Sequence, residues 1–238
     1  MKLKWDQDSE RLYETGTKHV VLYPKTSTGY ADGVAWNGVT GISESPSGGD
    51  ENNQYADDMK YLALRGAEDF GGTITAYTYP DEWAECDGSA YVATGVSVGQ
   101  QTRKAFGLSY RTAVGNDVDY DSYGYKIHLV YNATASPSEK SYASINDSPE
   151  AIEFSWEYTT TPVSIATKDP SGNEYKPSAT VTIDSTKLDA AGKEILHRLE
   201  DMLYGTDGAE GAEGTTAKLP TIDQVIAMFN ATESGAEG

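Results

Sequence analysis

The chain has 238 residues, 38% of them hydrophobic, and its 37 acidic residues outnumber its 18 basic ones to give a formal net charge of −19. This length allows one large β domain or two small ones, and the abundance of Tyr, Gly and Thr suits exposed strands and turns, not a helical bundle. The charge argues against the overall basic face of a duplex-binding protein, but it leaves a local basic patch open, and plain solubility is an alternative explanation of it.

The cysteine content and the N-terminal residues indicate the cellular compartment in which the chain folds. Cys86 is the single cysteine, which excludes an intramolecular disulfide and a cysteine-based zinc site. Residues 1–6 lack the apolar run of a signal peptide, and no segment approaches the ~20 apolar residues of a membrane span. We therefore expect folding in a cytoplasm, where the Asn-x-Ser/Thr triplets at Asn132, Asn146 and Asn230 carry no glycan.

The N-terminal part predicts an arm followed by strands. Residues 1–17 are polar and predict an N-terminal arm or lead-in. Apolar and β-branched runs predict strands at 19–23, 34–40 and 59–65. Between the last two lies a predicted long loop, 43–58. Because loops longer than about 12–15 residues inside a compact domain are usually functional or disordered, this loop is a candidate functional segment.

The stretch 66–87 is the best-defined element of the prediction. Residues 73–79 alternate between two faces with a period of two, which predicts a strand. Pro80 fits the first turn of a helix, so we predict a short helix over 80–87. Trp83 and Cys86 would then share one face of this helix and pack it across a sheet.

Further strands are predicted by the same apolar periodicity. In chain order they cover residues 91–98, 102–111, 125–131, 140–145, 151–158, 162–167 and 175–183. The connection 114–124 is rich in Asp, Asn and Gly, as expected of a hairpin tip. Residues 169–173 carry a turn signal.

The hydrophobic period changes near the C-terminus. A helix is predicted over 186–204, with Ser185 as its N-cap and an apolar stripe along one side. An acidic, Gly-rich linker follows at 205–218. The C-terminal segment, 219–238, contains a short amphipathic helix at 221–229, whose apolar face must bury against its own domain or a neighbouring copy.

The whole order predicts a mainly β fold. About ten strands and two or three helices favour an antiparallel β-sandwich or barrel over alternating βαβ units. We expect residues 18–204 to form this β domain, with a short flanking helix and C-terminal helices.

No motif of catalysis or cofactor binding stands out. His19, His128 and His197 are far apart in sequence, and a structural role is expected for each. The chain has no phosphate-binding loop, no dinucleotide fingerprint and no nucleophile elbow. We therefore predict no catalytic, cofactor-binding or metal-binding residues and no cofactor.

Two weaker patterns leave alternatives open. The run 117–121 resembles the start of a calcium loop, but Ser122 and His128 stand where an EF-hand needs Gly and Glu, which leaves at most a casual calcium site at a hairpin tip. The acid pairs Glu68–Asp69 and Glu82–Glu85 have the residue type of glycosidase carboxylates, although chance pairs are expected in so acidic a chain.

A set of ordered segments carries a resemblance to a known family. The segments are Tyr55–Asp58, Tyr61–Leu62, Glu68–Trp83, Phe106–Thr112, Gly115–Asp117, Tyr125–Tyr131, Asn146–Glu157, Thr160–Val163 and Leu219–Pro220. Together they cover roughly residues 50–230. The set resembles the major tail protein of long-tailed, non-contractile bacteriophages (siphophages), which builds the tail tube.

The resemblance implies an architecture and a set of partners. It implies a β-sandwich-like domain with a flanking helix, six copies of which form a ring whose sheets join around a lumen. Rings would stack into a tube that carries viral DNA to the host, without catalysis and without a membrane partner. The implied partners are further copies of the chain, a tape-measure protein in the lumen, tail terminator and tail-tip proteins, and DNA as transiting cargo. The implied location is the virion, after assembly in the host cytoplasm.

The residues agree with these expectations at several points. Sheet edges need partners, and pairing around a closed ring supplies them. The segments 43–58 and 114–124 suit ring-to-ring contacts, and the C-terminal helix suits docking on a neighbour. Acids that line the lumen would keep DNA phosphates off the wall during passage.

Two functions from other classes remain as alternatives. One is a carbohydrate-binding or adhesin-like β module of a phage or cell surface, whose tyrosines and four tryptophans (Trp5, Trp36, Trp83 and Trp156) would form sugar platforms. The other is a β-sandwich hydrolase that uses the paired acids.

Overall fold

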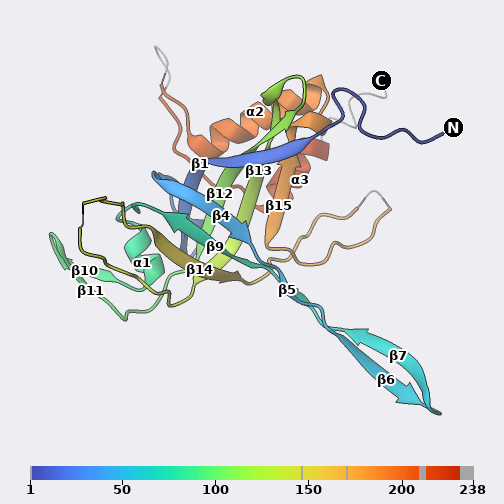
Figure 1. Cartoon of the computed structure of the whole chain (residues 1–238), viewed down its shortest axis with the longest axis horizontal. Helices are drawn as coiled ribbons and strands as arrows, with labels where there is room; N and C mark the ends of the chain where they lie inside the picture. Colours follow the sequence, from blue (N-terminus) through green and yellow to red (C-terminus); the bar gives the residue numbers. More distant parts are fainter. Residues whose placement is uncertain (1, 146, 170, 209–212, 231–238) are drawn as a thin grey trace.

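One large antiparallel sheet dominates the computed structural model, which describes residues 2–145, 147–169, 171–208 and 213–230 (Figure 1). Its strands are β1 (Tyr13–Thr26), β2 (Gly29–Tyr30), β3 (Val34–Ala35), β4 (Val39–Glu44), β9 (Gly71–Ala76), β12 (Phe106–Asn116), β13 (Tyr120–Ala135), β14 (Phe154–Thr160) and β15 (Thr180–Asp184). In the described part of the chain these nine strands follow the order β2-β1-β12-β13-β14-β9-β4, with β15 paired to β13 and β3 to β1. The prediction of a mainly β, antiparallel fold is confirmed.

Smaller elements surround this sheet. Among the described residues, three two-stranded sheets pair β5 (Ser47–Gly48) with β8 (Glu68–Asp69), β6 (Glu51–Ala56) with β7 (Met59–Arg65), and β10 (Ala90–Ala93) with β11 (Val96–Val98). The helices are α1 (Trp83–Asp87), a 3-10 turn η1 (Ser185–Lys187), α2 (Ala190–Tyr204) and α3 (Ile222–Asn230).

The large sheet curls until β1 approaches β4. The N–H of Trp36 donates to the carbonyl of Val20, and the N–H of Tyr77 to the carbonyl of Gly38, both at 2.8 Å. Gly38 has a φ of +75°, a left-handed conformation that breaks the predicted strand 34–40 into β3 and β4. The described strands do not close into a barrel, so that alternative of the prediction is wrong.

The inner face of the curled sheet holds one hydrophobic core. Aromatic side chains dominate it, and the rings of Trp36, Trp83 and Trp156 lie 4.6–5.6 Å apart between centroids. Its buried members are Val20, Leu22, Trp36, Ile74, Ala76, Trp83, Cys86, Phe106, Leu108, Tyr110, Val130, Ala133, Ala135, Trp156 and Tyr158. Burial of this many rings supplies a large share of the folding free energy.

Helix α1 fills the inner face, as the sequence predicts. Trp83 and Cys86 are both completely buried. The helix begins at Trp83, later than the predicted 80–87, because Pro80 starts a turn in which its carbonyl accepts from the N–H of Trp83 at 3.0 Å. Gly88, at a φ of +81°, ends the helix.

The outer face of the sheet forms a second core with α2 and α3 (Figure 1). Its buried members are Val21, Tyr23, Ile127, Leu129, Tyr131, Ile183, Leu196, Leu199, Leu203, Leu219, Ile222 and Val225. The C-terminal helix therefore buries its apolar side on its own chain, which answers one of the alternatives left open by its amphipathic pattern. Residues 231–238, where the predicted C-terminal tail ends, lie outside the described residues.

The start of α2 differs from the prediction. Ser185 begins the 3-10 turn, and the N-cap of α2 is Asp189, whose Oδ1 accepts from the N–H of Gly192 at 2.7 Å. Leu188, between the two elements, has an extended backbone. The predicted helix 186–204 is thus a short turn followed by α2, since an aspartate caps as well as a serine.

Helix α3 is held at its N-terminus by a capping box. The Thr221 Oγ1 accepts from the N–H of Gln224 at 3.2 Å, and the Gln224 Oε1 accepts from the N–H of Thr221 at 2.9 Å. The carboxylate of Asp223 accepts from the N–H groups of Ala166 and Thr167. Because these two N–H groups donate to a side chain, they are not available for pairing with another strand. The predicted strand 162–167 is therefore wrong, apart from one bridge at Val163.

The predicted long loop 43–58 is also wrong. The end of β4, the β5–β8 stem and the β6–β7 hairpin replace it, and the predicted strand 59–65 pairs back onto this segment. The two-residue connection consists of Asp57 and Asp58, with φ of +50° and +59°. Both central residues of a type I′ turn have positive φ, and this turn usually carries Asn-Gly, which is why the sequence did not indicate a hairpin here.

Five other boundaries differ from the predictions. Part of the predicted arm, residues 13–17, belongs to β1, and the predicted strand 91–98 is the β10–β11 hairpin, bent at Gly95. Residues 140–145 form no strand, and 175–179 precede β15 without joining it. The tip predicted at 114–124 is shorter, since β12 and β13 pair up to Asn116 and Tyr120.

Candidate functional site

The histidines and the cysteine predicted to be structural lie apart. His19 is on β1, His128 on β13 and His197 on α2. Within the described ranges, no group of three or more His, Cys, Asp and Glu side chains is placed to hold a metal ion. Burial raises the pKa of the Cys86 thiol to about 12, which removes the thiolate that reactivity requires.

The calcium-like run at the β12–β13 tip is occupied by the N-terminal arm. The Asp117 Oδ2 accepts from the Arg11 guanidinium at 3.1 Å, and its Oδ1 accepts from the N–H of Ser9 at 3.0 Å. The Asp119 Oδ2 accepts from the side-chain amide of Asn116 at 3.1 Å. Asp117 therefore fastens the N-terminal arm to the sheet, Asp119 is bound within the tip, and the described carboxylates here do not converge on a cation.

The tryptophans do not form a sugar platform. Trp36, Trp83 and Trp156 lie in the inner core, at 3%, 0% and 0% exposure. Trp5, in the N-terminal arm, is 71% exposed. The acid pairs are also separated from one another: Glu68 and Asp69 form β8 in the stem, and Glu85 on α1 is bound by Lys104 at 2.6 Å.

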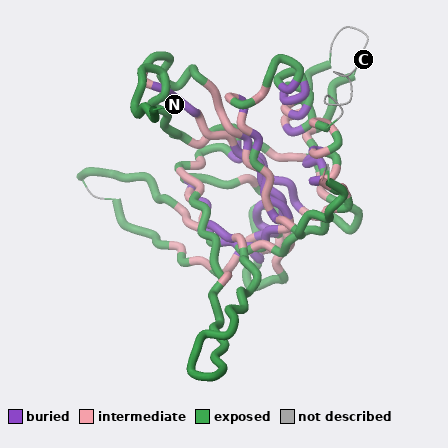
Figure 2. Tube along the Cα trace, turned by 90° about the vertical axis from the view of Figure 1, so that its right-hand side faces the viewer, coloured by how far each residue is buried: buried purple, intermediate pink, exposed green. Residues whose placement is uncertain are grey.

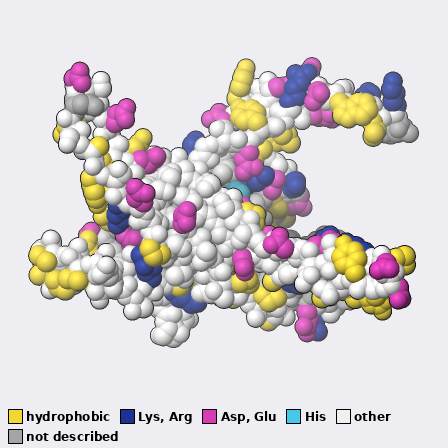
Figure 3. Space-filling model, turned by 60° about the horizontal axis from the view of Figure 1, so that its bottom comes forward, with side chains coloured by type: hydrophobic (Ala, Val, Ile, Leu, Met, Phe, Trp, Pro, Cys, Tyr) yellow, Lys and Arg dark blue, Asp and Glu magenta, His cyan; other side chains and the backbone are white. Residues whose placement is uncertain are grey.

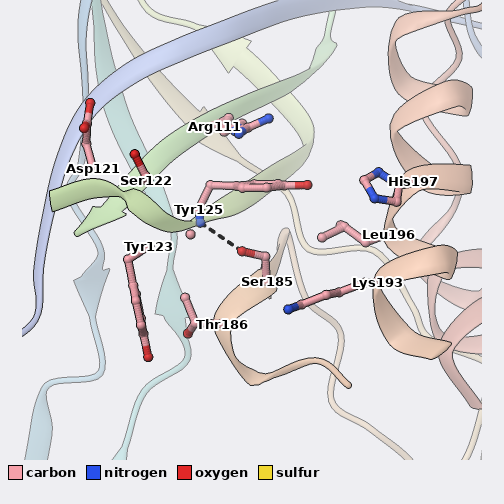
Figure 4. A pocket seen from close by; sticks show the side chains of 11 residues that line it. Arg111, Asp121, Ser122, Tyr123, Tyr125, Ser185, Thr186, Lys193, Leu196 and His197 are labelled. Atoms are coloured by element: carbon pink, nitrogen blue, oxygen red, sulfur yellow. Dashed lines mark hydrogen bonds between the residues drawn. The ribbon is translucent and has the colours of Figure 1, made fainter. Parts of the chain in front are cut away.

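A polar cavity of about 490 Å³ lies between the β13 strand and α2 (Figure 4). The Arg111 guanidinium lies 3.4 Å over the Tyr125 ring and 3.4 Å from the Glu200 carboxylate. The Ser185 hydroxyl accepts from the N–H of Tyr125 at 2.9 Å, while His197 Nδ1 lies 3.2 Å from Glu200. The hydroxyl and the imidazole thus have separate partners, and the cavity lacks the nucleophile–base pair of a hydrolase.

The most prominent exposed feature is a long arm. It consists of the β5–β8 stem and the β6–β7 hairpin, and it leaves the body as a narrow projection (Figure 1). Every residue from Glu51 to Arg65 is exposed (Figure 2). We call residues 45–70 the arm.

The two faces of the arm's hairpin differ in chemistry. On one face, Glu51 binds Lys60 and lies 3.5 Å from Arg65. On the other, Leu62 pairs across the strands with Gln54, and Leu64 with Asn52. The end of the hairpin carries three side chains that are at least 70% exposed: Tyr55, Met59 and Tyr61. One face thus carries ion pairs, while on the other Leu62 and Leu64 are 38% and 56% exposed.

Other projections also carry exposed apolar side chains. Leu3 and Trp5 lie in the N-terminal arm, and Tyr142 and Ile145 lie in the long connection between β13 and β14. Tyr91, Val92, Val96 and Val98 belong to the β10–β11 hairpin. Figure 3 shows hydrophobic side chains at the ends of segments that project from the body. Apolar surface that is presented on several projections at once is typical of an interaction protein.

A network of polar side chains closes one end of the inner face, where the arm leaves. We call it the root network; its members are Glu14, Glu44, Tyr110, Thr112, Lys126 and His128. The Glu14 carboxylate accepts from Lys126 Nζ and from the Thr112 hydroxyl, both at 2.6 Å. His128 Nε2 lies 3.1 Å from the Thr112 oxygen, and its Nδ1 lies 3.5 Å from Glu44 Oε1.

Tyr110 completes this network. Its ring stacks on the His128 imidazole at 4.7 Å between centroids, and its hydroxyl donates to Glu44. Hydrogen bonding to His128, helped by Tyr110 and opposed by burial, lowers the pKa of the Glu44 carboxyl. Burial opposes ionisation of Glu14 too, but the bonds from Lys126 and Thr112 outweigh it and lower its pKa. The sequence gives no sign of this network, because its members come from four separate strands.

The chain matches no model of a known protein family and no curated protein sequence. In the described part of the chain, no helix is both long enough and apolar enough to span a membrane. The resemblance to a tail tube protein therefore stays a prediction from the residues that carry it.

Proposed function

We propose that this protein is a structural subunit that assembles with copies of itself into hexameric rings, which stack into the tail tube of a long-tailed, non-contractile bacteriophage. The observation that carries the proposal is the arm. Its hairpin exposes Leu62, Leu64 and three large side chains at its end, far from either hydrophobic core. A two-stranded hairpin alone is marginally stable in water, so we expect a partner to cover it.

A second copy of the chain is the simplest such partner. The arm, the N-terminal segment, the β10–β11 hairpin and the connection before β14 each offer apolar side chains to a neighbour. A subunit of a closed ring that also stacks on other rings needs contacts in several directions, which one patch cannot provide. Several projections on one body suit that requirement.

The charge supports DNA as cargo and not as a bound ligand. A formal charge of −19 on each copy would make the wall of a lumen repel phosphates, so that DNA passes without sticking. In this proposal the further partners are a tape-measure protein in the lumen, a tail terminator and tail-tip proteins. The location is the virion, and the protein has no catalytic role.

Negative-stain electron microscopy over a concentration series, with light scattering on the same samples, tests the proposal. We expect six-fold rings or hollow tubes. Replacing both arm leucines, Leu62→Ser with Leu64→Ser, should raise the concentration at which scattering begins by at least about tenfold, because burying one leucine is worth about 1.5–3 kcal/mol. The matched control is Ala63→Ser, which changes the intervening residue on the opposite face of the hairpin.

Two results would contradict the proposal. One is a monomer at every concentration that stays monomeric when an extract of phage tail tips is added as an initiator. The other is assembly that the double leucine variant and the Ala63→Ser control support equally. Retention of a monomer on a glycan array would instead favour the carbohydrate-binding alternative, which the burial of three tryptophans has weakened.

A further inference from the structure

The hydrogen-bond donors of the root network define the state of His128. The Thr112 hydroxyl has one proton, and it donates that proton to Glu14 at 2.6 Å. Toward His128 the same oxygen can only accept, so Nε2 of the imidazole must carry a proton. Nδ1 then faces the Glu44 carboxylate at 3.5 Å, and it has no other hydrogen-bond partner among the described side chains.

Only one protonation state of His128 suits both neighbours. In the neutral Nε2–H form, a lone pair on Nδ1 would point at a carboxylate, and that contact repels. In the imidazolium form, both ring nitrogens are donors and the charge lies between Glu14 and Glu44, at 3.6 and 3.5 Å. The side chain of His128 is 14% exposed, so water screens these contacts less than it screens a surface pair.

The position of Glu44 connects this network to the arm. Glu44 is the last residue of β4, opposite Gly72 of β9, and the chain enters the arm directly after it. Glu14 lies on β1, while Thr112 and His128 lie on β12 and β13. The network therefore ties the root of the arm to the two central strands of the body.

We propose that His128 is a pH-responsive tie: its imidazolium holds the root of the arm to the body, and loss of its proton releases Glu44 and loosens the arm. The tie regulates the surface that the proposed function uses for assembly, and its biological meaning rests on that function. Histidine is the side chain that ordinarily changes charge between pH 5 and 8, so the tie is tested at one pH value on either side of this range.

Every charged group near His128 enters this balance. Glu14 from β1 and Glu44 from β4 favour the imidazolium, and Lys126 from β13 opposes it. Tyr110 and Thr112 from β12 donate to the carboxylates as neutral groups. Behind them, Tyr158 of β14 acts on Glu44, and Asp184 of β15 acts on Lys126. Two carboxylates thus contact the imidazole, while the lysine of the network is bound to Glu14.

Amide hydrogen exchange of the full chain, measured on peptides that cover β4 and β5, tests the tie in the free subunit. Comparing His128→Gln with wild type at the same pH cancels the chemical pH dependence of exchange. At pH 5.5 the variant should exchange about tenfold faster, the scale of one charge-assisted hydrogen bond, while at pH 8.5 the two proteins should agree. The control is His197→Gln, which should match wild type at both values.

A second variant guards against a folding defect in the first. Glu44→Gln keeps the histidine and removes its charged partner, so it should also exchange faster at pH 5.5. At pH 8.5 its difference from wild type should be smaller, because only the Tyr110 bond to this carboxylate is then lost. If wild type, His128→Gln and Glu44→Gln exchange equally at pH 5.5, or if the differences are the same at both pH values, the tie is refuted.

Light scattering of the same proteins separates this inference from the proposed function. If the exchange difference appears but no variant or pH yields assembly, the tie stands and the proposed function fails. If wild type assembles and neither exchange nor the onset of assembly depends on His128, the proposed function stands and the tie fails.

Discussion

Two strands that are close in the sequence, β7 and β9, have opposite surroundings. All residues of β7 (Met59–Arg65) are exposed, whereas four of the six residues of β9 (Gly71–Ala76) are buried. Both are antiparallel strands with partners, and β7 contains more large apolar side chains than β9. What differs is the second layer: Ile74 and Ala76 of β9 lie in the aromatic core with Trp83 of α1, whereas β7 contributes no residue to either core of the described chain. The apolar content of a strand therefore does not predict whether its side chains are buried, because burial depends on which other elements pack against the strand.

The largest expected effect on stability comes from a substitution in the core that buries β9. Trp156, paired across from Ile74 of β9, is completely buried and contacts the rings of Trp36 and Trp83. Replacing it, Trp156→Ala, should lower the free energy of unfolding by about 3–5 kcal/mol, since it removes a ring and leaves a cavity. Chemical denaturation followed by circular dichroism measures this loss.

The matched control for that change is Trp5→Ala in the N-terminal arm. Trp5 is 71% exposed, so its removal should change stability by no more than about 0.5 kcal/mol. Equal effects of the two substitutions would mean that Trp156 is not part of a packed core, and that the core and the exposed N-terminal arm do not differ in burial.

A smaller effect on stability is expected at the root network, where the arm joins the body, and it depends on pH. The pKa values of Glu14 and Glu44 are lowered in the folded protein, so the unfolded chain binds more protons than the folded one in acid. Stability from these two groups is present above the usual glutamate range and is lost as pH falls through their folded values. We therefore expect the denaturant concentration at the midpoint of unfolding to decrease once the pH is lowered below about 5, where free glutamates begin to bind protons.

The variant Glu44→Gln isolates this contribution. It should be less stable than wild type at pH 7 and should lose less stability between pH 5 and pH 3, because the titrating group is absent. Glu150→Gln, at an exposed position of the connection before β14, should keep the wild-type pH dependence. A wild-type slope in Glu44→Gln would show that other carboxylates carry the acid sensitivity.

Local elements could be predicted from the sequence, and non-local ones could not. The alternation that buries Ile74 and Ala76, and the three-residue spacing of Trp83 and Cys86, are properties of adjacent residues, and both predictions are confirmed. The root network joins Glu14 and Glu44 to Tyr110 and His128, and no spacing rule connects positions so far apart. The curl of the sheet, which brings β1 to β4, is a consequence of the whole fold.

The arm is a different kind of failure, since its signal is local but unusual. A two-residue hairpin turn is expected where Asn-Gly or Asp-Gly separates two strands. Here Asp57 and Asp58 occupy both left-handed positions, and the polar run before them resembles a loop. The structure replaces the predicted loop 43–58 with paired strands, while the functional role of this segment stays a prediction.

The smallest expected effect concerns the same turn, and it tests the structure of the β6–β7 hairpin. Asp58 has a φ of +59°, a conformation that costs most L-residues roughly 1 kcal/mol or more and costs glycine almost nothing. Asp58→Gly should relieve this strain, although glycine also gives the open hairpin more freedom. We expect a net gain of about two- to threefold in the protection of β6 and β7 amides from hydrogen exchange. Asp58→Ala should lower that protection, because alanine tolerates the left-handed region poorly. Protection of β9 should be the same in both variants, because the hairpin opens without unfolding the body. If Asp58→Ala protects the hairpin as well as Asp58→Gly, the turn is not left-handed and the register of β6 against β7 must differ.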